Sequence, residues 1–120
     1  MCIREVYQTL RDRFQGKCRL MSVFDVKLND DNSVCLTSTI SGGLISYIDL
    51  YEMYEENIND VIGMFIEIEH TYQNKGFSTL LGKPTFEFMQ TLDTLFAKAN
   101  YHTYSKNTVI TTQLTIYKED

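Results

Sequence analysis

Residues 19–40, "RLMSVFDVKLNDDNSVCLTSTI", constrain the fold more than any other stretch of the chain. Apolar and small residues alternate with their neighbours from Leu20 to Leu28, which is the period-two pattern of a β-strand. A second run rich in valine and threonine follows the Asn/Asp cluster at 29–32. Two such runs around an Asn/Asp turn predict an antiparallel hairpin, so the chain must build at least part of a sheet.

Helical spacing marks both ends of the chain. The apolar residues Ile3, Val6, Tyr7, Leu10 and Phe14 stand at helical spacing, and Gly16 follows as a stop signal, which predicts a first helix. Residues 83–100 predict another helix, with Pro84 near its first turn. The apolar positions of this second pattern are Phe88, Met89, Leu92, Leu95, Phe96 and Ala99. Residues 101–117 are β-rich, and we expect Ile110, Thr112, Leu114 and Ile116 to share one face of a strand.

The middle of the chain, residues 47–73, fits two interpretations. It can form one long helix that ends at Gly76. Alternatively, the helix ends near Asp60 and a strand begins, because residues 66–73 alternate strictly between two faces. A single helix would carry Gly63 in its interior, at a cost of about 1 kcal/mol. We favour the interpretation with a helix followed by a strand.

The order of these elements predicts an α+β fold: an antiparallel sheet with helices packed on one face. Helix–strand–strand recurs three times with a period near 40 residues, although the three units share no sequence identity. A chain of 120 residues with 43% hydrophobic residues is expected to form a single domain over 1–120.

Charge is strongly segregated along the chain. Residues 1–27 hold six basic and three acidic side chains, whereas residues 28–74 hold nine acidic side chains and no lysine or arginine. Residues 75–120 hold five basic and four acidic side chains. Such segregation creates a local field, which bears on the choice of partner more than on the fold.

The acidic middle is the best candidate for a functional surface. On a helix, Asp49, Glu52, Glu56 and Asp60 fall within a sector of about 80°, with neighbouring carboxylates about 5–6 Å apart along the axis. That spacing is comparable to the spacing of phosphates along a nucleic-acid strand. Tyr51 borders the row and is the best exposed anchor, because tyrosine is favoured at interfaces. The candidate partner-binding residues are Asp49, Tyr51, Glu52, Glu55, Glu56, Asp60, Glu67 and Glu69.

Few residues suit catalysis or cofactor binding. The chain has no nucleotide-binding, hydrolase or zinc-protease motif, so we expect no cofactor and no enzyme activity. "EIEH" at 67–70 lacks the i, i+4 spacing that chelates a metal ion on a helix. Cys2, Cys18 and Cys35 lack a CxxC pair and are expected to be reduced and buried. A pI near 4.9 argues against direct nucleic-acid binding.

These observations lead to a first functional hypothesis: a small acidic inhibitor that is not an enzyme. Its acidic helix would dock on a basic, nucleic-acid-type surface of a nuclease, effector or toxin. In size, charge and lack of motifs the chain resembles the DNA mimics and anti-CRISPR proteins of phages, and toxin-neutralising immunity proteins. The resemblance concerns these general properties only, and no shared sequence motif supports it.

Three further expectations accompany this hypothesis. The alternative function is a small-ligand-binding domain or an enzyme, with Tyr101, His102 and Tyr104 lining the site. A homodimer would bring the basic N-terminal segment against the acidic middle. The chain shows no signal peptide and no apolar run long enough for a membrane span, and its Ile, Tyr and Asn content is typical of AT-rich genomes. We therefore expect it in the cytoplasm of a bacterial host.

Overall fold

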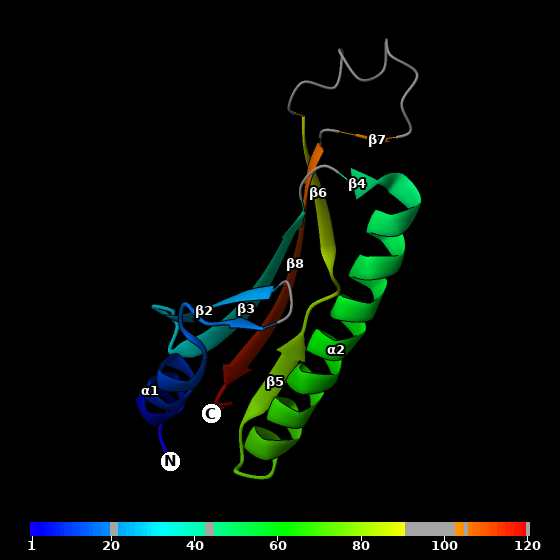
Figure 1. Cartoon of the computed structure of the whole chain (residues 1–120). Helices are drawn as coiled ribbons and strands as arrows, with labels where there is room; N and C mark the ends of the chain where they lie inside the picture. The colour runs from blue at the N-terminus through cyan, green and yellow to red at the C-terminus, as the bar shows by residue number, and fades with distance from the viewer. Residues whose placement is uncertain (20–21, 43–44, 91–102, 105, 120) are drawn as a thin grey trace.

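The computed structural model describes residues 1–19, 22–42, 45–90, 103–104 and 106–119, with side chains described for 1–18, 22–40, 56–85 and 109–119. Its elements are α1 (Ile3–Phe14), β1 (Cys18–Arg19), β2 (Ser22–Leu28), β3 (Ser33–Gly42), β4 (Ile45–Ser46), α2 (Tyr47–Gln73), β5 (Ser78–Leu81), β6 (Thr85–Gln90), β7 (Thr103–Tyr104) and β8 (Lys106–Tyr117). In Figure 1, α2 runs alongside β5 and β6, whereas α1 lies beside β2 and β3.

The main sheet is antiparallel, in the order β1-β2-β3-β8-β5, with β6 also paired to β8. The predicted hairpin is confirmed: Leu28 pairs with Val34, and the connecting turn places Asn32 in the left-handed region at φ 62°. Asparagine tolerates this conformation better than most residues, which is why the Asn/Asp cluster suits the turn. β4 and β7 form a separate two-stranded ladder.

One face of the sheet carries the hydrophobic core. Every second residue of the central strands is buried, and the predicted face of β8 is confirmed, since Ile110, Thr112, Leu114 and Ile116 are each at most 1% exposed. Ile3, Val6, Leu10 and Phe14 of α1 join the same core cluster as Val61, Phe65, Ile68 and Tyr72 of α2. The described helices therefore pack on one face of an antiparallel sheet, as an α+β fold predicts.

α2 is one continuous helix of 27 residues, so the predicted strand at 66–73 is wrong. The buried positions of its second half, from Asn57 to Tyr72, recur at helical spacing of three or four residues. Gly63 is exposed, and a Cβ added there would meet nothing within 4 Å. The alternation at 66–73 misleads because the helix leaves Ile66 41% exposed instead of burying it on a strand face.

A Schellman motif ends α2 at the glycine that the single-helix interpretation requires. Phe77 N–H donates to Tyr72 O, and Gly76 N–H donates to Gln73 O, each at 3.0 Å. Gly76 adopts φ 91°, which favours glycine. The Phe77 ring packs edge-on against Tyr72, with centroids 6.0 Å apart, so the hydrophobic contact typical of this motif is present.

The helix predicted over 83–100 is wrong at its start, because Thr85–Gln90 form strand β6. Its remaining residues, including Leu92, Leu95, Phe96 and Ala99, lie outside the described residues. Leu81 pairs with Leu114 and Thr85 pairs with Thr111, so three residues oppose two on β8. Pro84 lies in this break between β5 and β6, at the edge of the sheet, where a missing N–H is tolerated. The third helix–strand–strand unit therefore does not begin as predicted.

Polar contacts from the end of α1 cover the outer edge of β2. The Gln15 side chain accepts a hydrogen bond from Val26 N–H at 2.8 Å and donates one to the Asp25 carboxylate at 2.7 Å. Gly16 N–H also donates to Phe24 O at 3.0 Å. These bonds satisfy groups that an open strand edge would otherwise offer to another chain.

The three cysteines are free. Cys35 is buried on β3, as predicted, but Cys2 and Cys18 are exposed, so the prediction of burial is wrong for both. They precede and follow α1, outside the stretch whose apolar side chains enter the core.

Candidate functional site

The continuity of α2 extends the predicted row of carboxylates. At about 100° per residue, Glu67 falls in the same sector as Asp49, Glu52, Glu56 and Asp60. We call these five residues the acidic stripe. It follows the helix for about 27 Å, since each residue adds about 1.5 Å. Glu56, Asp60 and Glu67 are exposed, and Asp49 and Glu52 are placed by the helix backbone.

The other candidate residues lie off this stripe. Glu69 is half-buried on the side of α2 that faces β5, where its carboxylate accepts a hydrogen bond from Thr79 Oγ1 at 2.7 Å. Gln73 donates to the same Thr79 hydroxyl at 2.8 Å, so Glu69 helps to join α2 to β5. On the helix backbone, Tyr51 lies in line with Glu69, and Glu55 falls between that side and the stripe.

The exposed carboxylates of the stripe have no local partner. Among residues whose side chains are described, none forms a hydrogen bond or ion pair with the carboxylates of Glu56, Asp60 or Glu67. The sequence explains this, because residues 28–74 contain no lysine or arginine. Like charges spaced i, i+4, such as Glu56 and Asp60, destabilise an isolated helix by about 0.2–0.5 kcal/mol per pair. Among the described side chains, Glu56, Asp60 and Glu67 therefore make no contact that would offset this repulsion.

A groove of about 350 Å³ opens beside the stripe, between α1 and α2. Its lining is Arg13 of α1, Phe24 of β2, and Asn59, Asp60, Val61, Gly63, Met64 and Glu67 of α2. Phe24 and Val61, each 2% exposed, belong to the core beneath it. The groove thus combines an apolar floor with two carboxylates on one wall and a guanidinium on the other.

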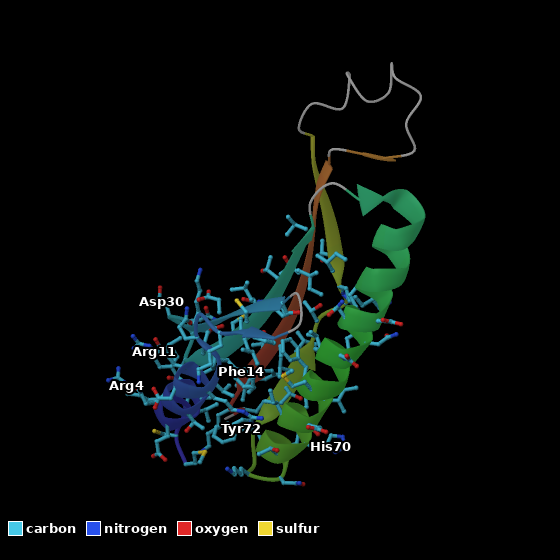
Figure 2. The ribbon with its side chains drawn as sticks, viewed as in Figure 1. Arg4, Arg11, Phe14, Asp30, His70 and Tyr72 are labelled. Carbon is cyan, nitrogen blue, oxygen red and sulfur yellow. The ribbon has the colours of Figure 1, made fainter. Side chains whose placement is uncertain are left out.

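Arg13 and Tyr72 link the two helices electrostatically. The Arg13 guanidinium lies 4.9 Å from the centroid of the Phe14 ring on its own helix. Burial raises the pKa of the Tyr72 hydroxyl above its ordinary value of 10.0, and the positive charge of Arg13 partly offsets the rise. Figure 2 shows Phe14 and Tyr72 in the region between α1 and α2, with His70 on the outer side of α2.

The described structure adds little support for the other candidate sites in the sequence. No three His, Cys, Asp or Glu side chains in the described part of the chain are grouped to hold a metal ion. Tyr101 and His102 lie outside the described residues, and Tyr104 is placed only by its backbone pairing with Ile45. A second hollow of about 430 Å³ lies near the end of β8, lined by residues that include Leu80, Thr115 and Tyr117.

The sequence identified the stripe but not the groove. Arg13 and Gly63 are 50 positions apart, and neither belongs to a motif that would connect them. Gly63 carries one local signal: it stands where the three- and four-residue spacing of the stripe would place another acidic side chain.

No family model, curated protein or solved structure matches this chain. Among the described residues, no helix is both long enough and apolar enough to cross a membrane.

Proposed function

We propose that this protein is a small binding protein, not an enzyme, that docks the acidic stripe on a basic surface of a partner protein. The observation that carries the proposal is a row of carboxylates along one side of a single helix, of which Glu56, Asp60 and Glu67 are exposed and have no partner among the described side chains. A row that costs helix stability, and whose described carboxylates form no ion pair with a described cation, is suited to a cationic partner.

The partner's surface is of the kind that binds nucleic acid. From Asp49 to Asp60 the carboxylates are about 5–6 Å apart along the helix axis, which approximates the spacing of backbone phosphates, and a gap of about 10 Å then separates Asp60 from Glu67. A stripe of about 27 Å covers several such positions, so it would occlude a channel rather than a single phosphate site. The simplest mechanism is competitive inhibition of a nuclease, an effector of a bacterial defence system or a toxin, in the cytoplasm of a bacterial host.

Association through such a surface is expected to be fast and steeply dependent on salt. Complementary charges steer the encounter and raise the association rate, and salt screens this attraction over a Debye length of about 8–10 Å. Complex formation should therefore weaken strongly between low and high ionic strength.

A capture experiment tests the proposal. Tagged protein is incubated with bacterial lysate at low and high salt, and bound proteins are identified by mass spectrometry. The stripe variant carries Asp49→Asn, Glu52→Gln, Glu56→Gln and Asp60→Asn. A matched control carries Glu5→Gln, Asp12→Asn, Asp30→Asn and Glu119→Gln, which change the net charge equally but lie off the stripe.

The expected result is a nucleic-acid-handling protein that binds the wild type and the control but not the stripe variant. Four peripheral charges at about 0.2–1 kcal/mol each predict a loss in affinity of about fourfold to several hundredfold. The wild type should also displace nucleic acid from the purified partner. Equal capture by all three forms, or no displacement, would contradict occlusion. Light scattering of the purified protein separates this outcome from a homodimer that uses the stripe.

A further inference from the structure

We infer that the groove beside Gly63 is a seat for an arginine side chain of the partner. This inference rests on the proposed function and adds to it the anchor residue of the complex. It depends on three features of the groove: its apolar floor, the placement of its carboxylates and the absence of a side chain at Gly63.

The floor suits the aliphatic part of a long basic side chain. Met64 is half-buried, packs against the core and offers most of the accessible apolar surface, because Phe24 and Val61 beneath the opening are each only 2% exposed. Lysine and arginine place their methylene groups on apolar surface while the charged head stays near polar groups. At about 350 Å³ the groove lies at the lower end of the range for ligand sites, which suits one side chain better than a large ligand.

The wall formed by α2 suits the charged head. Asp60 and Glu67 stand one turn before and one turn after Gly63, so their Cα atoms are separated by about 10 Å along the axis. A cation above Gly63 lies between the two carboxylates. The planar guanidinium has five donors and can bond both, whereas an ammonium ion is a compact point charge. We therefore assign the seat to arginine over lysine.

Gly63 keeps this seat open. A Cβ there would meet nothing within 4 Å, so no steric contact requires glycine in the fold. Any larger side chain would project toward the space between Asp60 and Glu67.

Arg13 allows a test in which the direction of the change in affinity distinguishes a cationic from an anionic guest. It lines the opposite wall and forms no ion pair with a described carboxylate. Its positive charge opposes a cationic guest and would attract an anionic one. Arg13→Gln is therefore expected to tighten the binding of a cation by about two- to fivefold, the usual effect of one exposed charge.

The probe is acetyl-arginine-amide, and the readout is the amide spectrum of the isotope-labelled full chain. Arginine should shift the amide signals of Gly63, Asp60 and Met64 more than that of Asp30, which lies on the hairpin turn. Acetyl-citrulline-amide, which has the same shape without the charge, should not shift them. Equal shifts with both probes, shifts spread over all exposed acidic residues, or no shifts at all would overturn the inference.

Two leucine variants complete the test. Gly63→Leu should reduce arginine affinity at least about tenfold, because it fills the seat and removes the bond to one or both carboxylates. His70→Leu places the same side chain on an exposed position of α2 outside the groove and should leave binding unchanged. If Gly63→Leu fails to fold, tighter binding by Arg13→Gln supports the seat, and unchanged or weaker binding rejects it.

The same variants separate this inference from the proposed function. If the captured partner is released by the stripe variant but still binds Gly63→Leu with full affinity, the seat is wrong and the occlusion mechanism stands. If the partner binds both variants as it binds the wild type, the proposed function itself fails.

Discussion

The two helices pack on the same core but use their charged residues differently. On α1, Gln8 donates to the Asp12 carboxylate at 2.9 Å, and Lys17 donates to the Asp12 backbone oxygen at 3.3 Å. The guanidinium groups of Arg11 and Arg13 lie over the rings of Tyr7 and Phe14. Most of the polar surface of α1 is thus engaged within its own helix or its neighbours.

On α2, charged groups separate into two sides. Glu69, on the β5 side, has a hydrogen-bonded partner, whereas the exposed carboxylates of the stripe have none among the described residues. Both helices need a buried side to fold, but the described part of α2 also carries exposed carboxylates that form no hydrogen bond or ion pair with other described side chains. The contrast is the reason that the proposed function assigns binding to the stripe and not to the charged residues of α1.

Removing the buried side of α2 should have the largest effect. Phe65 is fully buried in the core cluster, so Phe65→Ala is expected to lower the free energy of unfolding by about 3–5 kcal/mol, measured by urea denaturation. Ile66→Ala changes the exposed neighbour and should cost less than about 0.5 kcal/mol. Similar losses for both variants would show that α2 does not pack as described.

A smaller effect is expected where α1 covers the edge of β2. Gln15→Ala removes the acceptor of Val26 N–H and the donor to Asp25, and should cost about 1–2 kcal/mol in the same urea experiment. The control is Gln8→Ala, which removes only an exposed i, i+4 contact and should cost a few tenths of a kcal/mol. If the two costs are equal, the contacts of Gln15 do not protect the edge.

The pH dependence of stability reports on the burial of the Tyr72 hydroxyl. The pKa of Tyr72 is raised in the folded state. Below the unfolded pKa near 10, its contribution to the free energy of unfolding therefore does not change with pH. Above pH 10 the unfolded chain releases its proton first, and stability should fall as pH rises through the folded pKa. Tyr72→Phe should make this fall shallower in urea titrations between pH 9 and 11, values chosen to bracket about 10. A slope identical to that of the wild type would assign the alkaline loss to other groups.

Local patterns predicted the elements whose signals agreed with one another. In α1, the apolar spacing from Ile3 to Phe14 and the following Gly16 indicate the same boundaries, and both are confirmed. The hairpin was predictable for the same reason, since strand alternation and turn residues coincide there. These stretches needed no information from distant parts of the chain.

The prediction failed where a local pattern fits two structures. Residues 66–73 alternate like a strand, but Ile68 and Tyr72 also continue the helical spacing of Phe65, and burial of all three against the sheet decides for the helix. The local pattern predicts a helix that includes residues 85–90, although their pairing with β8 makes them a strand. Partner strands distant in sequence are not visible in a local window.

The candidate site also has one part that local patterns predict, the stripe, and one part that they do not, the groove. The stripe follows from helical spacing alone, and recognising one helix extends it to Glu67. The groove depends on how α1 and α2 are placed on the sheet, which brings Arg13 to the same opening as Gly63. No spacing rule within either helix contains that information.

The smallest expected effect is also the most direct check of the contrast between the helices. Glu56→Gln with Asp60→Asn relieves a like-charge i, i+4 pair on α2, so the free energy of unfolding should rise by about 0.2–0.5 kcal/mol at low salt. Asp12→Asn on α1 should lower it slightly, because Asp12 accepts a hydrogen bond from Gln8. Thermal melts at low and high salt measure both changes, and the gain on α2 should shrink as salt screens the repulsion. A loss of stability from the α2 substitutions would mean that these carboxylates have a partner within the fold, and the case for an intermolecular role of the stripe would then fail.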